Sequence, residues 1–446
     1  MLTNLRHRQT HRDVWALAGP MLLSNLTVPL VALVDTAVVG HLPHDHQLAA
    51  VAVGGNLYTL LVWAMGFLRM GTTGFAAQAL GRHDGSALRT LLAQGLLLGA
   101  GLGLALALLM LPLTPWLLTL MQPSAALDAL AQEYLYIRLL GLPAALCSFA
   151  LIGWLLGTQN ARIPLAMLLT SSLCNVVLDI AFVWGLHWGV AGAAWASVIA
   201  EWSGLLLGLL LGLKTLRRHP GHLQWAALQQ AHTWSALLAV NRDIFIRTLA
   251  LEVVFFLLTL YGTRLGDSTV AANALLLNGL LITANALDGL AHAVEALCGK
   301  AIGAQQPQAL WRALQVAGLW SVGFAVLLSG AFWLLGEPFI ALQTSLPAVQ
   351  QIAQAHLPYL AALPVVAVIS YLLDGLFVGA TRAREMRNAM LIALALYLPL
   401  SWPLAALGNH GLWSGFLLFM AMRGLSLSLM TWQIASSPSG FMVKHR

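Results

Sequence analysis

Seven carboxylic acids lie inside long apolar stretches of this sequence, where ionisable side chains are rare. The seven acids are Asp35, Asp179, Glu201, Glu252, Asp288, Glu295 and Asp374. A charged carboxylate at the centre of a bilayer costs about 2.5–3.5 kcal/mol on insertion scales, so it faces a cavity, binds a partner or stays protonated. These acids are therefore the first candidates for binding a proton or a cation.

Asp35 lies in the stretch VPLVALVDTAVVGHL, residues 28–42, which contains no Lys or Arg. A carboxyl group in an apolar environment without a neighbouring cation can hold and release a proton. Pro20 precedes Asp35 in the same apolar stretch. Because proline removes a helical hydrogen bond and bends the helix, Pro20 is a candidate hinge.

Asn175 and Asp179 are four residues apart and therefore lie on one face of a helix. The amide can donate to the carboxylate and fix its rotamer, which suits a second group of a proton site. The alternative is structural, because polar side chains also hold membrane helices together.

The second half of the chain offers a possible second cation site of Glu252, Tyr371, Asp374, Asp288 and Glu295. Tyr371 and Asp374 are three residues apart, and Asp288 and Glu295 are seven apart, so each pair shares a helix face. The alternative for these acids is ion pairing with arginines inside the same apolar stretches.

Composition places the chain in a membrane. Of its 446 residues, 59% are hydrophobic and only 9% are charged, and the mean hydropathy is +0.80. A soluble domain carries about 25% charged residues. We predict twelve membrane spans, since each crossing needs roughly 20 apolar residues. The predicted spans are residues 14–40, 48–75, 89–112, 127–157, 162–185, 188–213, 238–263, 269–298, 310–336, 347–379, 384–406 and 410–435.

Basic residues orient these spans. With the N-terminus in the cytoplasm, 17 Lys and Arg residues at span ends and in loops fall on the cytoplasmic side, and only Arg264 falls on the other side. Four more, Arg69, Arg138, Arg247 and Arg423, lie within or at the edge of spans. Both termini are then cytoplasmic. The doubled GxxxG pattern of Gly95, Gly99 and Gly103 predicts close helix packing.

The sequence repeats itself with an offset of 222 residues. Matching pairs include Gly40 and Gly262, Asn56 and Asn278, Gly81 and Gly303, Arg162 and Arg384, and Gly189 and Gly411. We predict an all-α integral membrane protein of two six-helix lobes, related by a pseudo-two-fold axis along the membrane normal. The lobes are residues 1–213 and 238–446, with a cytoplasmic linker at 214–237.

The repeat also shows which residues of the second half stand at the positions of the acids of the first half. Asp35, Asn175 and Asp179 correspond to Leu257, Tyr397 and Ser401, none of which is an acid. Proton chemistry is therefore assigned mainly to the first lobe. Glu201 corresponds to Arg423, and we interpret both as structural.

Several classes of function are disfavoured. The basic residues form no stripe with aromatics, so nucleic acid is not expected as a partner. The cysteines have no paired spacing, and the loop HLPHDHQ is interpreted as solvated, so no metal is expected. No GxxxxGK[ST] segment exists for ATP. We expect no cofactor beyond a coupling ion, H⁺ or possibly Na⁺.

Motifs across both halves resemble the multidrug and toxic compound extrusion (MATE) family, and within it the DNA damage-inducible F (DinF) branch. They include LAGPMLLSNLTVPLVALVDTAVVGHL, GWLLGTQNARIP, NVVLDIAFVWGLHWGVAGAAWASVIAE and YLLDGLFVGATRAREMRN. The resemblance implies a secondary transporter, not an enzyme, that exports cationic or amphipathic compounds in exchange for H⁺ or Na⁺. It implies proton coupling at Asp35 with Asn175, Asp179 and a span-four tyrosine, matched here to Tyr136, and a bend at Pro20.

We therefore expect a multi-pass protein of the bacterial inner membrane that works by rocking of its lobes and functions as a monomer. Three alternatives stay open. The first is Na⁺-coupled antiport, with Glu252 and Asp374 on the spans that some relatives use. The second is flipping of a lipid-linked glycan, which would need a cationic cavity. The third, an integral-membrane transferase, would need a polar catalytic loop, and no loop here is long enough.

Overall fold

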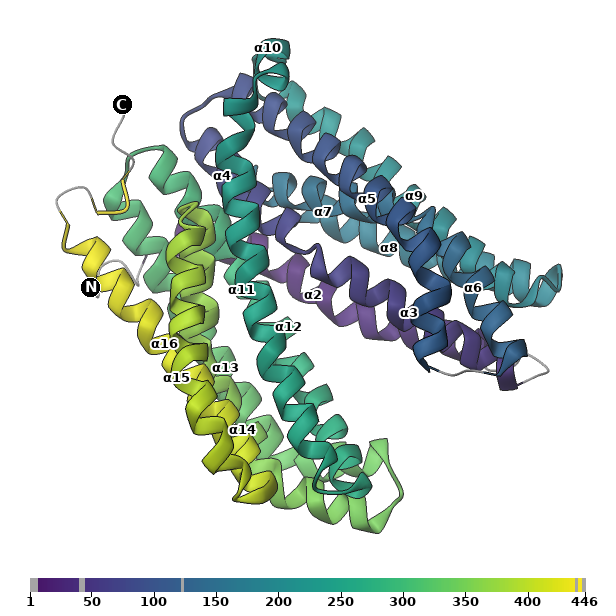
Figure 1. Cartoon of the computed structure of the whole chain (residues 1–446). Coiled ribbons are helices and arrows are strands. Elements are labelled where there is room, and N and C mark those ends of the chain that lie inside the picture. The colour runs from purple at the N-terminus through teal and green to yellow at the C-terminus, as the bar shows by residue number, and fades with distance from the viewer. Residues whose placement is uncertain (1–6, 40–44, 122–123, 438–439, 443–446) are drawn as a thin grey trace. The chain divides into compact units, whose positions relative to one another are not determined.

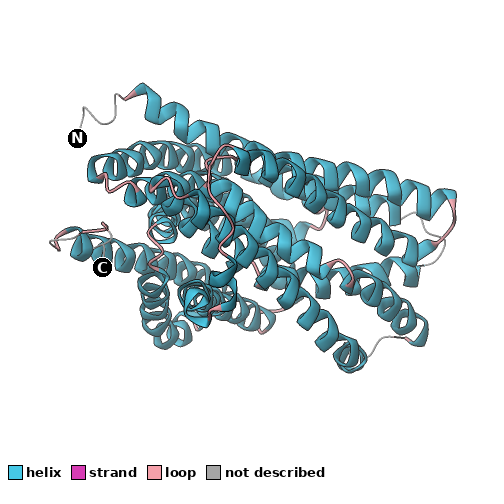
Figure 2. Cartoon of the chain, turned by 90° about the horizontal axis from the view of Figure 1, so that it is seen from above, coloured by secondary structure: helices cyan, strands magenta, loops and turns pink. Residues whose placement is uncertain are grey.

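The protein is described from a computed structural model that covers residues 7–39, 45–121, 124–437 and 440–442. Within these ranges, the side chains of residues 26–39, 45, 120, 121, 125 and 232 are not part of the description. All regular elements in the described ranges are helices (Figure 1). Short loops join most of them, as Figure 2 shows from above.

The helices of the first half agree with the predicted spans. They are α2 (Arg8–Val39), α3 (Asp45–Ala64), α4 (Phe67–Gly81), α5 (Gly85–Met121), α6 (Ala125–Leu139), α7 (Leu142–Gly157), α8 (Arg162–Asp179), the π-helix η1 (Ile180–Gly185) and α9 (Gly189–Arg217). The second half contains α10 (Trp225–Gln229), α11 (Ala231–Thr263), α12 (Asp267–Gly303), α13 (Pro307–Gln343), α14 (Pro347–Gly379), α15 (Ala383–Ala405) and α16 (Gly408–Ala435).

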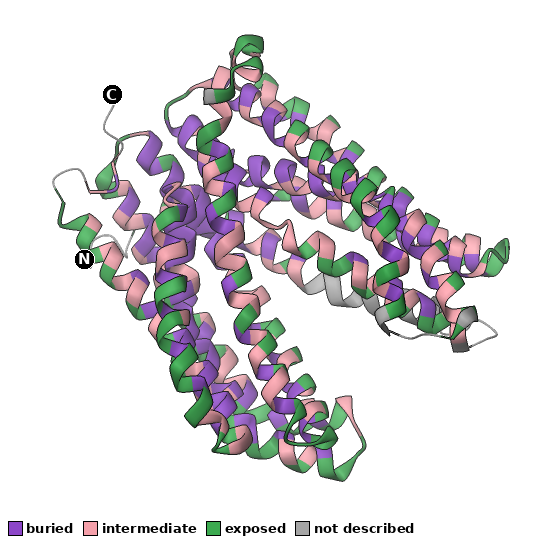
Figure 3. Cartoon of the chain, in the orientation of Figure 1, coloured by how far each residue is buried: buried purple, intermediate pink, exposed green. Residues whose placement is uncertain are grey.

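Among the described residues, ten helical segments are long and apolar enough to cross a membrane. The pair α6 and α7, bent by 45° where Gly141 precedes Pro143, forms an eleventh. The 32-residue helix α2 accounts for the remaining predicted span. Large apolar side chains are widely exposed, including Leu342 at 88% and Trp402 at 75%. Figure 3 shows exposed residues on most of the helices.

The chain divides into two compact units. Unit 2 is Leu23–Leu237, and unit 1 is Leu238–Arg446 together with the chain up to Leu22. The division differs from the predicted lobes in the first turns of α2. Within unit 1, Trp320 donates to His11 Nδ1 at 3.0 Å, and the rings of Trp15 and Trp320 meet edge to face at 5.1 Å. These aromatic contacts hold the start of α2 against α13.

Glycines set how closely α5 and α7 pack within unit 2. A Cβ atom added at Gly99 would come within 2.9 Å of the Cys147 backbone nitrogen, and one added at Gly103 within 2.6 Å of Pro143 Cα. Because both neighbours are backbone atoms, only glycine fits. The close packing predicted from the doubled GxxxG pattern is confirmed.

The predicted linker at 214–237 is partly helical, since α9 extends to Arg217 and α10 and the start of α11 follow. Arg89 of α5 donates to the carbonyl groups of His219 at 2.5 Å and Leu216 at 2.9 Å. Burial, with the positive charges of Arg89 and Arg218, lowers the pKa of His219, so its ring is uncharged at neutral pH. The beginning of the linker is thus bound to α5 inside unit 2.

Candidate ion- and proton-binding sites

In unit 2, α8 buries the Asn175–Asp179 face that the four-residue spacing predicts. Asn175 is 5% exposed and Asp179 is 2% exposed, whereas Leu173 and Val177 on the same helix are 67% and 63% exposed. The amide of Asn175 donates to Ser197 Oγ of α9 at 3.3 Å. This contact explains how α8 and α9 hold the polar face between them.

Asp179 ends α8, and the next six residues form the π-helix η1. Single π-turns within helices are rare and are frequent at functional sites, because the wider turn changes the direction of side chains and backbone carbonyls. The acid therefore occupies a point where the regular helical hydrogen-bonding pattern changes. Nothing in the sequence indicated this change, since the segment IAFVWG is uniformly apolar.

The two tyrosines of α6 point to different neighbours. Tyr136, the residue that the sequence suggested, donates its hydroxyl to the carbonyl of Leu111 in α5 at 3.3 Å. Tyr134 is 6% exposed and packs in a cluster with Val183 of η1 and Val190 of α9. Tyr134 is therefore the α6 tyrosine on the side of the segment that follows Asp179. A motif match cannot separate residues two positions apart when the rotation of the helix is unknown.

Two residues of α2, Asp35 and Pro20, belong to the predicted proton site and its hinge. Asp35 lies in the helical part of α2, but its side chain is outside the described residues, so its role stays a prediction. Pro20 is half-buried within α2, which is assigned as a single helix from Arg8 to Val39. Its role as a hinge also stays a prediction.

A second polar cluster in unit 2 joins α3, α6 and α9. Arg138 Nη2 and Glu201 Oε1 are 2.9 Å apart, and the Tyr58 hydroxyl donates to Glu201 Oε2 at 2.8 Å. The guanidinium carbon of Arg138 lies 3.8 Å from the centre of the Tyr58 ring. A Cβ atom at Gly141 would fall 2.0 Å from Glu201 Oε2, so a glycine makes room for the carboxylate. The structural interpretation of Glu201 is supported by this pairing.

A pocket of about 170 Å³ opens beside Glu201 within unit 2. Glu201, Ser148 and Ser171 supply its polar lining, and apolar side chains such as Val62, Phe149 and Met167 supply most of the rest. A mostly apolar pocket with one carboxylate and two hydroxyl groups suits an amphipathic ligand that carries a positive charge or a hydrogen-bond donor.

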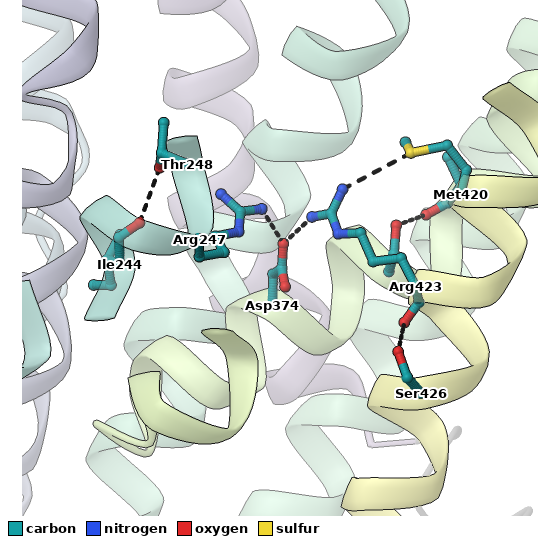
Figure 4. Close-up of polar contacts among 9 residues, drawn as sticks. Ile244, Arg247, Thr248, Asp374, Met420, Arg423 and Ser426 are labelled. Atoms are coloured by element: carbon teal, nitrogen blue, oxygen red, sulfur yellow. Dashed lines mark hydrogen bonds and ion pairs between the residues drawn. The ribbon is translucent and has the colours of Figure 1, made fainter. Parts of the chain in front are cut away.

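In unit 1, Asp374 of α14 is the centre of a buried ion-pair network (Figure 4). Its Oδ2 atom accepts from Arg247 Nη2 of α11 at 2.5 Å and from Arg423 Nη2 of α16. Asp374 is 6% exposed and Arg423 is 2% exposed. For Asp374, the structure therefore agrees with the alternative to a cation site, which was ion pairing with arginines of the apolar stretches. Its Oδ1 atom is buried without a hydrogen-bond partner among the described residues, but the two guanidinium charges on the same carboxylate disfavour a metal cation in this arrangement.

The other members of the predicted second cation site also lie in unit 1. Arg423 lies over the Tyr371 ring at 5.5 Å, and the charges acting on Tyr371 include Asp288. Glu295 is buried on α12, where its backbone carbonyl oxygen would lie 2.5 Å from a Cβ atom at Gly379, five residues beyond Asp374 on α14. Glu252 has a buried Oε1 atom without a hydrogen-bond partner among the described residues.

The internal repeat places residues of opposite charge at equivalent positions of the two ion-pair clusters. Glu201 and Arg423 are equivalent by the offset of 222 residues, and each forms an ion pair inside its own unit. Glu201 pairs with Arg138, and Arg423 pairs with Asp374. Each unit therefore pairs the charge at this repeat position with an opposite charge inside the same unit, as low-dielectric surroundings favour.

These features define the class of protein. The sequence profile of the MatE family matches residues 20–181 and 244–403. A bundle of membrane-spanning helices built as a duplicated sequence, with buried polar clusters in both units, is the architecture of a secondary membrane transporter. The chain belongs to the MatE family, whose members are secondary transporters and not enzymes.

Curated relatives agree with this assignment. The chain is 45% identical over 417 residues to the DNA damage-inducible protein F of Escherichia coli, covering 94% of this chain and 91% of that protein. It is 26% identical to the multidrug resistance protein PmpM of Pseudomonas aeruginosa, covering 99% of this chain and 94% of PmpM.

Solved structures show the same fold. A mutant of the Vibrio cholerae MATE transporter VcmN superposes with a TM-score of 0.88 at 20% identity, covering 97% of this chain and 99% of that one. A transporter of the MOP superfamily from Pyrococcus furiosus superposes with a TM-score of 0.80 at 21% identity, covering 94% of this chain and 95% of that one. The predicted fold of twelve spans in two six-helix lobes is confirmed.

Proposed function

We propose that this protein is a proton-coupled multidrug efflux antiporter of the bacterial inner membrane, with both termini in the cytoplasm and a monomer as the working unit. Membership of the MatE family and the similarity to the DNA damage-inducible protein F support transport. The observation that carries the proposal is the buried Asn175–Asp179 face in unit 2, the unit that also contains Asp35.

The coupling step is proton uptake by Asp35 from the outer side. A protonated Asp35 no longer attracts a cationic compound, and it can pack toward Asn175 and Asp179, so the compound leaves outward. The lobes then rock, and the proton is released inside. A compound drives this exchange only if it binds the two arrangements with different affinity. For each charge moved, the membrane potential contributes about 2.3 kcal/mol per 100 mV.

We assign the cationic or amphipathic compound to the pocket beside Glu201. The carboxylate supplies negative charge, Ser148 and Ser171 supply hydroxyl groups, and the apolar walls accept aromatic or aliphatic groups. Glu201 is already paired with Arg138, which limits its attraction for a cation. A weak electrostatic contribution and a large apolar one favour many compounds of similar shape over one specific compound.

Two alternatives are less well supported. Sodium coupling at Asp374 would place Na⁺ on a carboxylate whose Oδ2 atom already binds Arg247 and Arg423, against the repulsion of both guanidinium charges. Flipping of a lipid-linked glycan would require a cationic cavity for phosphate groups. In unit 2, Arg138 is already paired with Glu201. In unit 1, Arg247 and Arg423 share the one carboxylate of Asp374, so this pair of bridges holds one positive charge in excess, but both guanidinium groups are bound to that acid.

The test is the variant Asp35→Asn in everted membrane vesicles, with drug-induced proton movement as the measurement. We expect exchange to fall by at least about tenfold, as for loss of a proton-transfer group. The matched control is Asp128→Asn, which alters a carboxylate that accepts from Gln132 near the start of α6. Wild-type exchange in the Asp35 variant, at equal protein in the vesicles, would refute the assignment.

A further inference from the structure

Two histidines from different helices stack on each other in unit 1. His356 of α14 and His410 of α16 have ring centres 4.2 Å apart and ring planes inclined by 30°. His356 is 5% exposed, whereas His410 is exposed. The Tyr359 hydroxyl lies 3.3 Å from His410 Nδ1. A buried and an exposed imidazole are thus in direct contact beside a phenol.

Hydrogen bonding fixes the tautomer of the buried ring. His356 Nδ1 is 2.7 Å from the carbonyl oxygen of Ile352. Because a carbonyl oxygen only accepts, Nδ1 must carry the hydrogen, which leaves Nε2 of the neutral ring with a lone pair. That Nε2 atom is buried and has no hydrogen-bond partner among the described residues. A second proton on His356 would therefore find no acceptor there.

The position of His410 is fixed from a third helix. The side chains of Asn409 and Asn273 of α12 exchange two hydrogen bonds of 2.8 and 2.9 Å, and Trp413 Nε1 donates to Asn273 at 2.8 Å. These neighbours are neutral. Among the described residues, the titratable groups that contact His356 from α14 and α16 are Tyr359 and His410. The ring contacts of the pair with titratable groups are therefore those between its own two rings and with the phenol of Tyr359.

We propose that His356, His410 and Tyr359 form a single-proton site in unit 1. The proton binds to His410, and the stacked His356 remains neutral and presents its ring face to the charge. Two charged rings at this distance would repel each other, so the site holds one proton. Protonated His410 carries hydrogen on Nδ1, so it can no longer accept from Tyr359, and the hydroxyl must turn to accept instead.

The site lies on the helices that carry the buried ion-pair network. His356 and Asp374 both belong to α14, and His410 and Arg423 both belong to α16. Pro358 lies inside α14 between His356 and Tyr359, and because proline has no backbone N–H, the helix lacks a donor at that point. Protonation therefore acts on the α14–α16 contact. A role in coupling rests on the proposed function, whereas proton binding itself does not.

The experiment is a pH titration of the full-length protein labelled with ¹⁵N-histidine in lipid nanodiscs, followed by NMR between pH 5 and 8. The chain contains 14 histidines, and His410→Gln and His356→Gln assign the two signals by their loss. We expect His410 to titrate and His356 to keep the Nδ1–H tautomer throughout. His356→Gln and Tyr359→Phe should each shift the His410 midpoint by at least about 0.5 pH unit, as for loss of one contact.

The matched control is His222→Gln in the exposed linker, which should leave the His410 midpoint unchanged. Tyr359→Phe keeps the ring and removes only the hydroxyl, so it tests the site even if a histidine variant misfolds. An unchanged His410 midpoint in both His356→Gln and Tyr359→Phe would overturn the proposal, as would free titration of His356. Asp35→Asn should not move these signals, so failure of the transport mechanism and failure of this site are distinguishable.

Discussion

A buried charge is costly unless it is paired, and Asp374 is the acid that pairs with both Arg247 and Arg423. All three groups lie in a mostly buried position, where an unpaired guanidinium is strongly unfavourable. Within the same unit, Glu385 pairs with Arg382 at 3.1 Å, but both side chains are about one-third exposed. Substitutions at Asp374 and Glu385 therefore allow a buried ion pair to be compared with a partly exposed one in the same fold.

We predict that Asp374→Asn lowers the free energy of unfolding by about 3–5 kcal/mol, because it leaves two buried arginines without a counter-charge. Glu385→Gln is the control and should cost less than about 1 kcal/mol. Thermal melting of the purified variants in one detergent measures both. Equal melting temperatures for the two variants would show that the arginines at Asp374 are solvated or paired elsewhere.

Individual helices are placed by small residues where backbones meet, and α5 shows this most clearly. Gly99 and Gly103 face the backbone of α7, whereas a Cβ atom at Gly101 would meet nothing within 4 Å. The three glycines lie on one helix within five residues, yet only two of them are needed for packing. The GxxxG spacing alone identifies the two that are needed, since they share a face.

We predict that Gly103→Ala destabilises unit 2 by about 1–3 kcal/mol, because the added methyl group would require α7 to move away from α5. Gly101→Ala should be neutral, or stabilising by up to about 1 kcal/mol, through its higher helix propensity. The measurement is again the melting temperature in detergent. A Gly101 variant that melts as low as the Gly103 variant would place the α5–α7 contact on a different face.

At the scale of the whole molecule, the two units differ in how their central acids are neutralised. In unit 1 Asp374 is bound by two arginines, and in unit 2 Glu201 is bound by one arginine and one tyrosine. The repeat that built both units kept their helices but exchanged acid and base at positions 201 and 423. We therefore expect the coupling ion to bind mainly in one unit, and the proposed proton site of Asp35, Asn175 and Asp179 places it in unit 2.

We predict that purified protein in proteoliposomes moves labelled organic cations when a proton gradient is imposed, and that a sodium gradient at constant pH gives less than about one-tenth of that rate. The reason is that two guanidinium charges beside Asp374 repel a further cation while both arginines stay bound. Liposomes without protein and an ionophore that collapses each gradient are the controls. Uptake that follows the sodium gradient alone would transfer the coupling role to Glu252 and Asp374.

Some local features followed directly from spacing. The four-residue interval predicted the buried face of Asn175 and Asp179, and the glycine spacing predicted the α5–α7 packing. Spacing did not predict which partner each acid takes. Glu201 pairs with Arg138, 63 residues away, and Asp374 pairs with Arg247, 127 residues away. The choice between Tyr134 and Tyr136 likewise depended on the rotation of α6.

By itself, the sequence determined that the chain spans a membrane twelve times in two related halves, because apolar length and repeat spacing are properties of the chain alone. Only the tertiary structure decided which buried charges neutralise each other, where the helix after Asp179 widens, and that His356 and His410 stack although 53 residues separate them. The physical reason is that a buried polar group is stabilised by contacts in space, and the side chains that make them come from helices whose rotation and neighbours the linear order does not specify.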